Sequence, residues 1–318
     1  MVEYYIGKRS RFTYAKEVTY ATAPGSSAWG YIPAQTVTPT SKSDIEAINV
    51  IDSSPTRDVS SYFETLRTYG ATVDGLIQHF AFCTLAWGTD DHIGSTHTIT
   101  PATNIPSFSM NFGYDSSSGN DHIMELLGGK INKLDISCTK GEFLKFSAEI
   151  VAQKGATTPS WRSPSAGSDV TQFYTSIAMP AYHYSGSDVE INGTTYCNTE
   201  SIKLSINNNL HSEPVLCSTN GKRISESVPQ IREYDASVTI RMKEPDLYDL
   251  WEDDAYLPND TTFTFTSGSR ILTFTLNNVR IESAISPLNI SEGIVLVELP
   301  MKCTSIGVTE VNTLSGDY

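Results

Sequence analysis

One β unit occurs twice in this chain, and that repetition constrains the fold more than any other feature of the sequence. Residues 270–303 begin with an alternating run, RILTFTL, and close with a continuous apolar run that Pro300 ends. Both runs are typical of strands. Residues 128–154 repeat the order: a strand, a turn containing Glu and Gly, and a strand whose end, Glu149-Ile150, matches Glu298-Leu299. This repeated pattern predicts two similar β domains.

A second match lies upstream of the first in both copies. The motif R-x-Y-[GD]-A-[TS]-V starts at Arg67 and again at Arg232, 165 positions later. Each motif is followed by a short helical segment that ends in Trp, at Trp87 and at Trp251, 164 positions apart. The two Glu-aliphatic pairs, Glu149-Ile150 and Glu298-Leu299, are only 149 positions apart. The first copy should therefore hold an insertion of about fifteen residues, which we place in the polar region 89–120, and the two matches together indicate an internal duplication.

Local signals fix several elements within this frame. Apolar residues recur at helical spacing from Leu76 to Trp87, and Gly88 is placed to end a helix. Asn192-Gly193 is a strong signal for a two-residue hairpin turn.

These signals predict a mainly β fold of two tandem β-sandwich or barrel domains, each with one short packed helix. The Pro/Ser/Gly-rich segment after residue 153 has the composition of a linker. We expect an N-terminal arm and first strand in 1–40, domain 1 in 41–153 with the insertion, a linker in 154–169, domain 2 in 170–303, and a C-terminal tail in 304–318.

Composition and charge exclude several classes of protein. The formal net charge of −14 argues against a protein that grips phosphates, because such binding needs clustered Lys and Arg. The five cysteines are widely spaced with no C-x-x-C pair, so we expect them to be reduced and mostly buried. The N-terminus shows no apolar signal-peptide core, and no apolar run approaches a membrane span. We therefore expect no membrane contact and synthesis in a cytoplasm.

The sequence offers few groups that could form a catalytic or metal site. It has no G-x-S-x-G, H-E-x-x-H or Walker pattern, so we expect no enzyme and no cofactor. Two clusters could supply metal ligands in principle, but polar loop residues explain both of them better, and we expect no metal site. These clusters are Asp90, Asp91 and His92 with His97, and Asp121 and His122 with Glu125.

The N-terminal region interleaves aromatic and basic residues, including Arg9, Arg11, Phe12 and Tyr14. A nucleic-acid-binding arm is one interpretation of such a pattern. Since the rest of the chain is strongly acidic, an arm that pairs with a neighbouring acidic subunit is the better one, and Arg and Tyr are typical interface residues.

At this point the residues carry a resemblance to a known family. The opening FTYAKEVTYATAP, the segment RISESVPQIREYDASVTIRMKEPDLYDLW and the closing TLNNVRIESAISPLNISEGIVLVELPMKC resemble the tail tube proteins of long-tailed bacterial or archaeal viruses, in the larger type with two tandem tube domains. The resemblance covers nearly the whole chain and is densest over residues 200–303. The first half departs more from the pattern through its insertion.

The resemblance implies a structural virion protein whose sheets join side by side into a ring with a continuous inner β-barrel. Single-domain relatives form six-fold rings, so a duplicated chain should need three copies, with a hexamer as the alternative. The rings would stack into a tail tube for ejection of viral DNA, which passes without specific binding, and would meet tape-measure, terminator and tip proteins. Candidate subunit or ring contacts are Arg9, Arg11, Phe12, Tyr14, Arg57, Arg223, Asn289 and Glu292.

Two other functions stay open from the sequence. A two-domain β-sandwich recognition module that binds a carbohydrate or receptor would use loop aromatics such as Trp29 or Trp161. A glycoside-active enzyme that uses Asp/Glu pairs has the least support.

Overall fold

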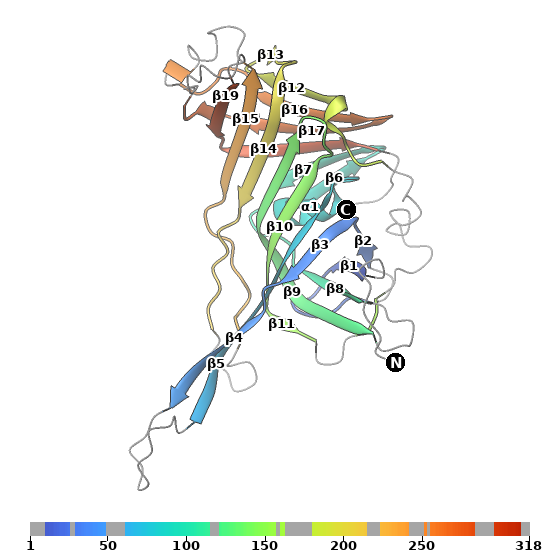
Figure 1. Ribbon diagram of the computed structural model, residues 1–318, viewed down its shortest axis with the longest axis vertical. Helices are drawn as coiled ribbons and strands as arrows, with labels where there is room; N and C mark the ends of the chain where they lie inside the picture. Colours follow the sequence, from blue (N-terminus) through green and yellow to red (C-terminus); the bar gives the residue numbers. More distant parts are fainter. Residues whose placement is uncertain are drawn as a thin grey trace.

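The computed structural model shows a protein built almost wholly of antiparallel strands in two sheets (Figure 1). It describes residues 10–25, 29–48, 61–114, 121–156, 160–162, 180–214, 223–241, 251–252, 255–283 and 296–312. Within these residues no helix is long and apolar enough to cross a membrane. The mainly β sandwich expected from the sequence is confirmed.

The larger sheet has 13 strands and runs through both halves of the chain. Its main order is β18 (Arg280–Ile281), β19 (Leu296–Lys302), β15 (Glu233–Arg241), β14 (Thr199–Asn207), β9 (His122–Thr139), β10 (Lys145–Ala152), β5 (Ser61–Leu76) and β3 (Ala34–Pro39). The first part of β9 leaves this row and pairs with β8 (Phe108–Tyr114) and β11 (Lys154–Gly155), and β8 pairs with β1 (Ser10–Lys16), which pairs with β2 (Gly30–Tyr31). Strand β4 (Lys42–Ile48) pairs with β5 in a hairpin that projects from the body (Figure 1).

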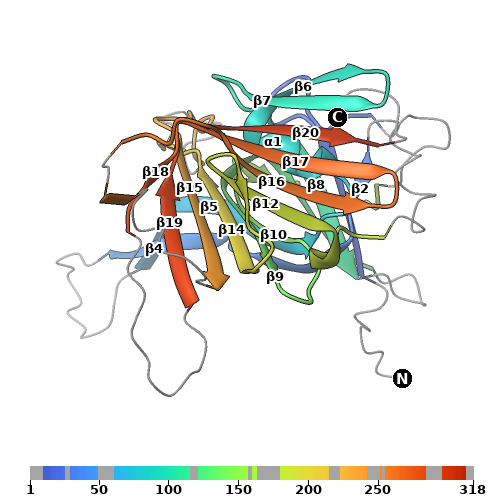
Figure 2. The same ribbon diagram turned by 90° about the horizontal axis from the view of Figure 1, so that it is seen from above.

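The smaller sheet has seven strands and packs over one end of the larger one. Its order is β13 (Thr194–Thr195), β12 (Ser187–Ile191), β16 (Thr261–Ser267), β17 (Arg270–Asn277), β20 (Ser305–Val311), β7 (Thr96–Pro101) and β6 (Gly88–Ile93). Figure 2 shows β12, β16, β17 and β20 side by side in this layer, with β14, β15 and β19 in the other. Asn192 and Gly193 form the expected turn between β12 and β13, each with the positive φ that such a turn requires.

The strand pairings of the first half recur in the second half in the same order. In the first half the strands pair in two rows, β2-β1-β8-β9-β11 and β9-β10-β5-β3. In the second half the matching rows are β13-β12-β16-β17-β20 and β18-β19-β15-β14. The long strand β9 is the counterpart of two strands: its first part corresponds to β17 and its second part to β18.

This scheme corrects the sequence-based view of the repeated stretch. In the first copy β9 and β10 pair directly, whereas in the second copy β17 lies in the smaller sheet and β19 in the larger one. Residues 270–303 are therefore not one strand pair. Only the two residues of β18 join β19, at the place where the chain crosses between the sheets.

The ladders also correct the alignment of the two copies. Ala71 faces Ile150, and its counterpart Ala236 faces Met301, so Ile150 corresponds to Met301 and not to Leu299. The sequence alignment is wrong by two residues. Since side chains alternate with a period of two, a shift of two leaves the buried face unchanged, and alternation cannot detect it.

The β6–β7 hairpin occupies the inserted region. It spans residues 88–101, which overlap the first part of the range 89–120 where the insertion was expected, and the counterpart scheme has no equivalent for it. The hairpin pairs through β7 with β20 of the second half. The first half thus extends the smaller sheet of the second half.

Strand β19 continues through Pro300, which the sequence analysis took as the end of a strand. The oxygen of Pro300 accepts a hydrogen bond from Glu282, on the side of the short strand β18. In an antiparallel strand the nitrogen of the same residue points to the same side. The N–H that Pro300 lacks would therefore face the edge of the sheet, where proline is tolerated.

Helix α1 (Ala81–Trp87) packs between the two halves. The predicted helix is confirmed in its second half only: it begins at Ala81, because Leu76 still belongs to β5, and it ends at Gly88, whose φ of 118° suits glycine. On one side Phe82 meets Tyr14 of β1 edge to face, at 5.1 Å between ring centroids. On the other side Phe80 meets Phe274 of β17 at 5.5 Å. Of the second expected helix only Trp251 and Glu252 lie among the described residues.

Candidate assembly interface

The two halves join through a continuous ladder between β9 and β14. Seven consecutive residues of each strand pair, from Ser201 with Thr139 to Asn207 with Lys133. Beyond the ladder, the N–H of Lys140 donates to the oxygen of Glu200 at 2.8 Å, and its side chain pairs with the Glu200 carboxylate at 3.1 Å. The large sheet therefore crosses from one half to the other without an interruption in its hydrogen bonding.

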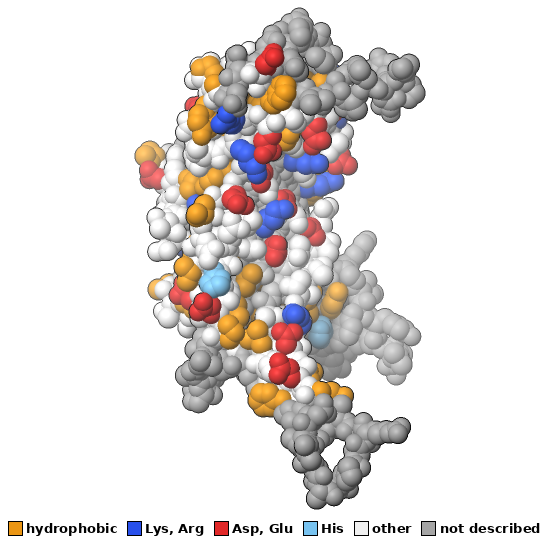
Figure 3. Space-filling model, turned by 90° about the vertical axis from the view of Figure 1, so that its left-hand side faces the viewer, with side chains coloured by type: hydrophobic (Ala, Val, Ile, Leu, Met, Phe, Trp, Pro, Cys, Tyr) orange, Lys and Arg blue, Asp and Glu red, His pale blue; other side chains and the backbone are white. Residues whose placement is uncertain are grey.

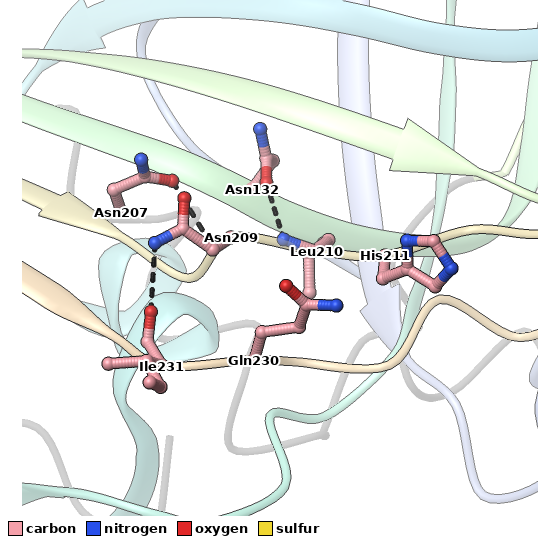
Figure 4. Close-up of a pocket in the computed structure, with 7 residues that line it drawn as sticks. All are labelled: Asn132, Asn207, Asn209, Leu210, His211, Gln230 and Ile231. Carbon is pink, nitrogen blue, oxygen red and sulfur yellow. Dashed lines mark hydrogen bonds between the residues drawn. The ribbon is translucent and has the colours of Figure 1, made fainter.

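A polar hollow of about 380 Å³ lies at the end of this junction (Figure 4). The Asn132 side chain accepts the N–H of Leu210 at 2.9 Å, and the Asn209 side chain donates to the oxygen of Ile231 at 2.8 Å. These amides tie the loop after β14 to β9 and to the returning chain. Their hydrogen bonds stay within the hollow wall, so the hollow acts as a joint between segments and offers no set of converging charges.

The two ends of the large sheet differ from this closed junction. At one end β3 pairs with β5 alone, and at the other end β18 pairs with β19 alone, among the residues that the structure describes. Thr40 donates its N–H to the oxygen of Gly70 in β5, so by alternation the nitrogen of Pro39 faces the open side of β3. Proline at that position protects an edge strand from indiscriminate pairing.

A groove of about 400 Å³ runs beside the open edge of β3, and we call it the β3 groove. It lies between β3, the start of β1, the end of β8 and the start of β9. Its lining mixes apolar and polar side chains, among them Arg11, Phe12, Val37, Phe112, Tyr114 and Met124.

The projecting β4–β5 hairpin carries large apolar side chains in the open. Ile45, Tyr62 and Phe63 are 62%, 71% and 53% exposed. The loops after β14 project in the same direction (Figure 1) and carry Val228 and Ile231, both well exposed. Exposed apolar side chains gathered on projecting segments are typical of surfaces that contact another molecule.

The uncovered face of the large sheet is polar and carries both signs of charge. Lys133 pairs with Asp135 at 2.9 Å, Lys302 pairs with Asp235, and Arg241 joins Lys140 on the carboxylate of Glu200. Figure 3 shows red and blue side chains interspersed over the side of the molecule where β14, β15 and β19 lie. A face of this kind presents little net charge to a polyanion.

Hydrogen bonds shift the protonation of these pairs toward their charged forms. The hydrogen bond with Asp235 raises the pKa of Lys302. Partial burial opposes ionisation of Glu200, but hydrogen bonds from Lys140 and Arg241 lower its pKa below the usual value. Lys302 and Glu200 are therefore both charged at neutral pH.

A buried polar cluster links the halves behind the large sheet. Glu310 of β20 accepts the N–H of Phe80 at 3.0 Å and the hydroxyl of Tyr182 at 2.9 Å. Arg270 donates to two backbone oxygens and lies over the Tyr182 ring at 5.1 Å. Burial, together with the nearby Arg270 and His97, lowers the pKa of His79 to about 4. Each of these contacts joins two parts of this chain, so the cluster stabilises the fold.

The residues once considered as metal ligands serve the fold. His97 and Asp90 do meet, at 2.8 Å across the β6–β7 hairpin, and His92 stacks on His97 with ring centroids 4.4 Å apart. Asp121 accepts the Trp161 indole N–H and Glu125 pairs with Arg162. Among the described residues, no three His, Cys, Asp or Glu side chains come together as metal ligands.

The structure separates the candidate contact residues into three groups. Arg11 and Phe12 line the β3 groove, although Phe12 is itself almost fully buried. Tyr14 lies in the core against Phe82, because residues 10–16 form β1 of the chain's own fold. Arg223 is half-buried next to the bridge between Ile224 and Pro214. The other candidates, Arg9, Arg57, Asn289 and Glu292, lie outside the described residues.

Sequence reasoning missed the apolar residues of the hairpin and the groove. The run SYFETL at the start of β5 does hold a signal, since Tyr62 and Phe63 stand in a polar stretch without alternation. Val37 and Met124 have no such signal. Only the position of β3 at the end of the sheet makes them the lining of a groove.

Comparison with known proteins bears on this arrangement of open edges, projecting segments and a polar sheet face. A family model described as phage tail tube protein matches residues 7–305, nearly the whole chain. No individual curated protein matches the chain. The match extends through both repeats, both sheet edges and the inserted hairpin, and the chain therefore belongs to the phage tail tube protein family.

Proposed function

We propose that three copies of this chain join head to tail into a ring, and that the rings stack into the tube through which viral DNA is ejected. The observation that carries the proposal is the β9–β14 junction, where one repeat continues the large sheet of the other. By the repeated pairing scheme β3 is the counterpart of β14, and β18 is the counterpart of the second part of β9. The chain thus ends in two edges that complement each other in the same way as the junction.

Such a contact is heterologous, because the two edges are different surfaces, and it closes into a ring if the rotation allows. The duplication supports a count of three chains, since each chain brings two repeats to a pseudo-six-fold ring. The repeated pairings support an internal duplication, but with units that run from β1 to β11 and from β12 to β20, so that residues 10–39 belong to the first unit and residues 305–311 to the second. The two units share both sheets, through β9 with β14 and β7 with β20.

The projecting segments are suited to stacking of the rings. The β4–β5 hairpin and the loops after β14 extend beyond the same end of the large sheet (Figure 1). Their exposed apolar side chains would be covered by the next ring. The ends of the tube would meet the tape-measure, terminator and tip proteins.

The uncovered polar face of the large sheet is the best candidate for the channel wall. The smaller sheet and α1 lie on the other face, and this bulkier layer needs the larger circumference outside the ring. On the inner face each Lys or Arg named above has an acidic partner, so passing DNA meets few free cations. Since every phosphate contact strengthens binding to the wall, paired cations leave the DNA able to move.

Two measurements on the purified protein test the ring and the tube. Negative-stain microscopy should show tubes, and native mass spectrometry of a single ring should give three chains. A ring of six chains would overturn the count, and discrete monomers under all conditions would overturn the assembly itself. In virions, Asp135→Lys with Asp235→Lys should slow DNA ejection, whereas Asp91→Lys with Asp188→Lys, on the smaller sheet, should leave it unchanged.

A further inference from the structure

One lysine of the first half is almost fully buried and bonds to a segment of the second half. Lys130 lies in β9, and its side chain is only 5% exposed. Its Nζ donates to the carboxylate of Glu226 at 2.8 Å and to the oxygen of Ser227 at 2.9 Å. The same ammonium lies over the ring of Tyr20, 5.6 Å from its centroid. Lysine is almost never buried unless it is paired, so a charge in this place points to a specific role.

The partners of Lys130 belong to the projecting loops after β14 (Figure 1). We call the described base of these loops, residues 211–214 and 223–228, the second-half ribbon. Its two sides meet at a β-bridge, in which the N–H groups of His211 and Val228 donate to each other's oxygens at 2.9 Å. Val228 is 59% exposed, so the ribbon carries apolar surface away from the body. Lys130 thus links β9 of the first half to a projection of the second half.

The counterpart projection of the first half is held in another way. There β5 runs from the large sheet straight into the β4–β5 hairpin, and its 16 residues pair with β4 at one end and with β3 and β10 at the other. One continuous strand fixes the direction of that hairpin. In the second half β15 begins only at Glu233, so no described strand of the large sheet continues into the ribbon. The ribbon therefore depends on contacts from its side, and Lys130 supplies a charged one.

We propose that Lys130 is a positioning residue for the second-half ribbon and holds it where its exposed apolar side chains reach the next ring. This inference rests on the stacking of rings proposed above. Because Lys130 is buried inside one chain, it acts on stacking only through the ribbon. Closure of the ring uses the β3 and β18 ends of the large sheet, whereas β9 lies in its middle, so ring closure should not depend on Lys130.

The surroundings of Lys130 make the substitution Lys130→Met selective for the ribbon. The Glu226 side chain is 55% exposed, so without the ammonium it returns to water and no buried charge is left behind. Methionine is a flexible apolar chain that can replace the lysine stem beside Tyr20. The variant loses the two charge-assisted hydrogen bonds to the ribbon. The ribbon should then open about ten- to a hundredfold more often, the loss expected for hydrogen bonds to a charged group.

Hydrogen–deuterium exchange of the full chain, below the concentration at which tubes form, measures this opening. The amides of His211 and Val228 should exchange about ten- to a hundredfold faster in Lys130→Met than in the parent, because both are bonded across the ribbon. The amides of the β16–β17 ladder should exchange at the parent rate, which verifies that the body of the variant is folded. An unchanged rate at both ribbon amides would show that Lys130 does not hold the ribbon.

Two further variants separate position from charge. Lys133→Met is the matched control in the same strand, since that side chain is 43% exposed and its ion pair with Asp135 lies on the surface. It should leave exchange in the ribbon unchanged. Glu226→Gln keeps an acceptor oxygen for the ammonium but removes the negative charge, so it should speed exchange by less than Lys130→Met does. An equal increase in Lys133→Met would mean that the effect is not specific to the buried lysine.

Negative-stain microscopy connects the ribbon to stacking. Lys130→Met should still form rings, but its yield of tubes should fall by about tenfold or more relative to the parent and to Lys133→Met. Faster exchange in the ribbon together with a normal yield of tubes would overturn the role in stacking. If the parent protein forms neither rings nor tubes, the proposed function fails and that role fails with it, whereas the exchange rates still decide whether Lys130 holds the ribbon.

Discussion

The two halves of the chain share a scheme of strand pairing but differ in what completes them. In the second half the start of β14 is covered by the β9–β10 turn, and the end of the smaller sheet is extended by the inserted β6–β7 hairpin. Both additions come from the first half. The first half has no such cover on its own β3 edge among the described residues. The comparison teaches that one scheme of strand pairing can leave one half covered from within the chain and the other half with an uncovered edge.

The largest effect should come from breaking the buried cluster that joins the halves. Glu310→Ala removes the acceptor of the Phe80 N–H and the Tyr182 hydroxyl, both of which belong to buried residues. Since each unsatisfied buried donor costs about 1–3 kcal/mol, the free energy of unfolding should fall by about 2–6 kcal/mol. Urea unfolding should show this shift, and Glu298→Gln, on an exposed position of β19, should stay within about 0.5 kcal/mol of the parent. Equal urea midpoints for the two variants would show that the Glu310 cluster does not stabilise the contact between the two halves.

A smaller effect should follow from acidification, through His79. Its pKa falls from 6.5 unfolded to about 4 folded, because it is buried and faces Arg270 and His97. The neutral form is favoured in the fold, so its contribution is complete above pH 6.5 and is lost as the pH falls toward 4, by up to about 3 kcal/mol.

Unfolding in urea at pH 7 and at pH 4.5 measures this dependence. His79→Gln cannot take up the proton, so its midpoint should fall less between the two pH values than that of the parent. Other titrating groups act equally in both proteins and cancel in the difference. Identical pH dependence of the two proteins would show that the fold does not lower the pKa of His79.

The smallest effect should come from a pair of matched turn residues. Gly128 and Asn278 both have positive φ, of 68° and 50°, where the two copies cross from one sheet to the other. A Cβ on Gly128 would lie 3.0 Å from the Tyr20 ring and 3.1 Å from Ala21, so Gly128→Asn should cost about 1–2 kcal/mol. Asn278→Gly should change stability by about 0.5 kcal/mol or less, because Asn tolerates this backbone and Gly adopts it freely. Thermal unfolding compares them, and equal losses would mean that crowding at Gly128 is unimportant.

Local patterns predicted the elements well because their causes are local. Helix α1, the Asn192-Gly193 turn and the alternating strands all follow from side-chain periodicity or backbone preference. The change in spacing between the two matches also predicts an insertion, and the β6–β7 hairpin, which has no counterpart in the second half, lies where that insertion was expected to begin. The domain limits remain a prediction, since both sheets run across the expected linker.

The errors arose where the answer depends on a partner strand. Pro300 is compatible with β19 because its nitrogen faces the short strand β18, which the sequence cannot reveal. The shift of two residues between Leu299 and Met301 keeps the same face buried and so leaves no trace in the alternation. Asp90 and His97 do meet, but only the surrounding fold shows that they brace a hairpin.

The sequence by itself determined that this chain is a mainly β protein with a repeated pattern and a net negative charge, because repetition, alternation and composition are properties of the chain alone. The tertiary structure decided which strands share a sheet, which edges stay open and which charges neutralise one another. Those properties depend on contacts between residues far apart in the sequence.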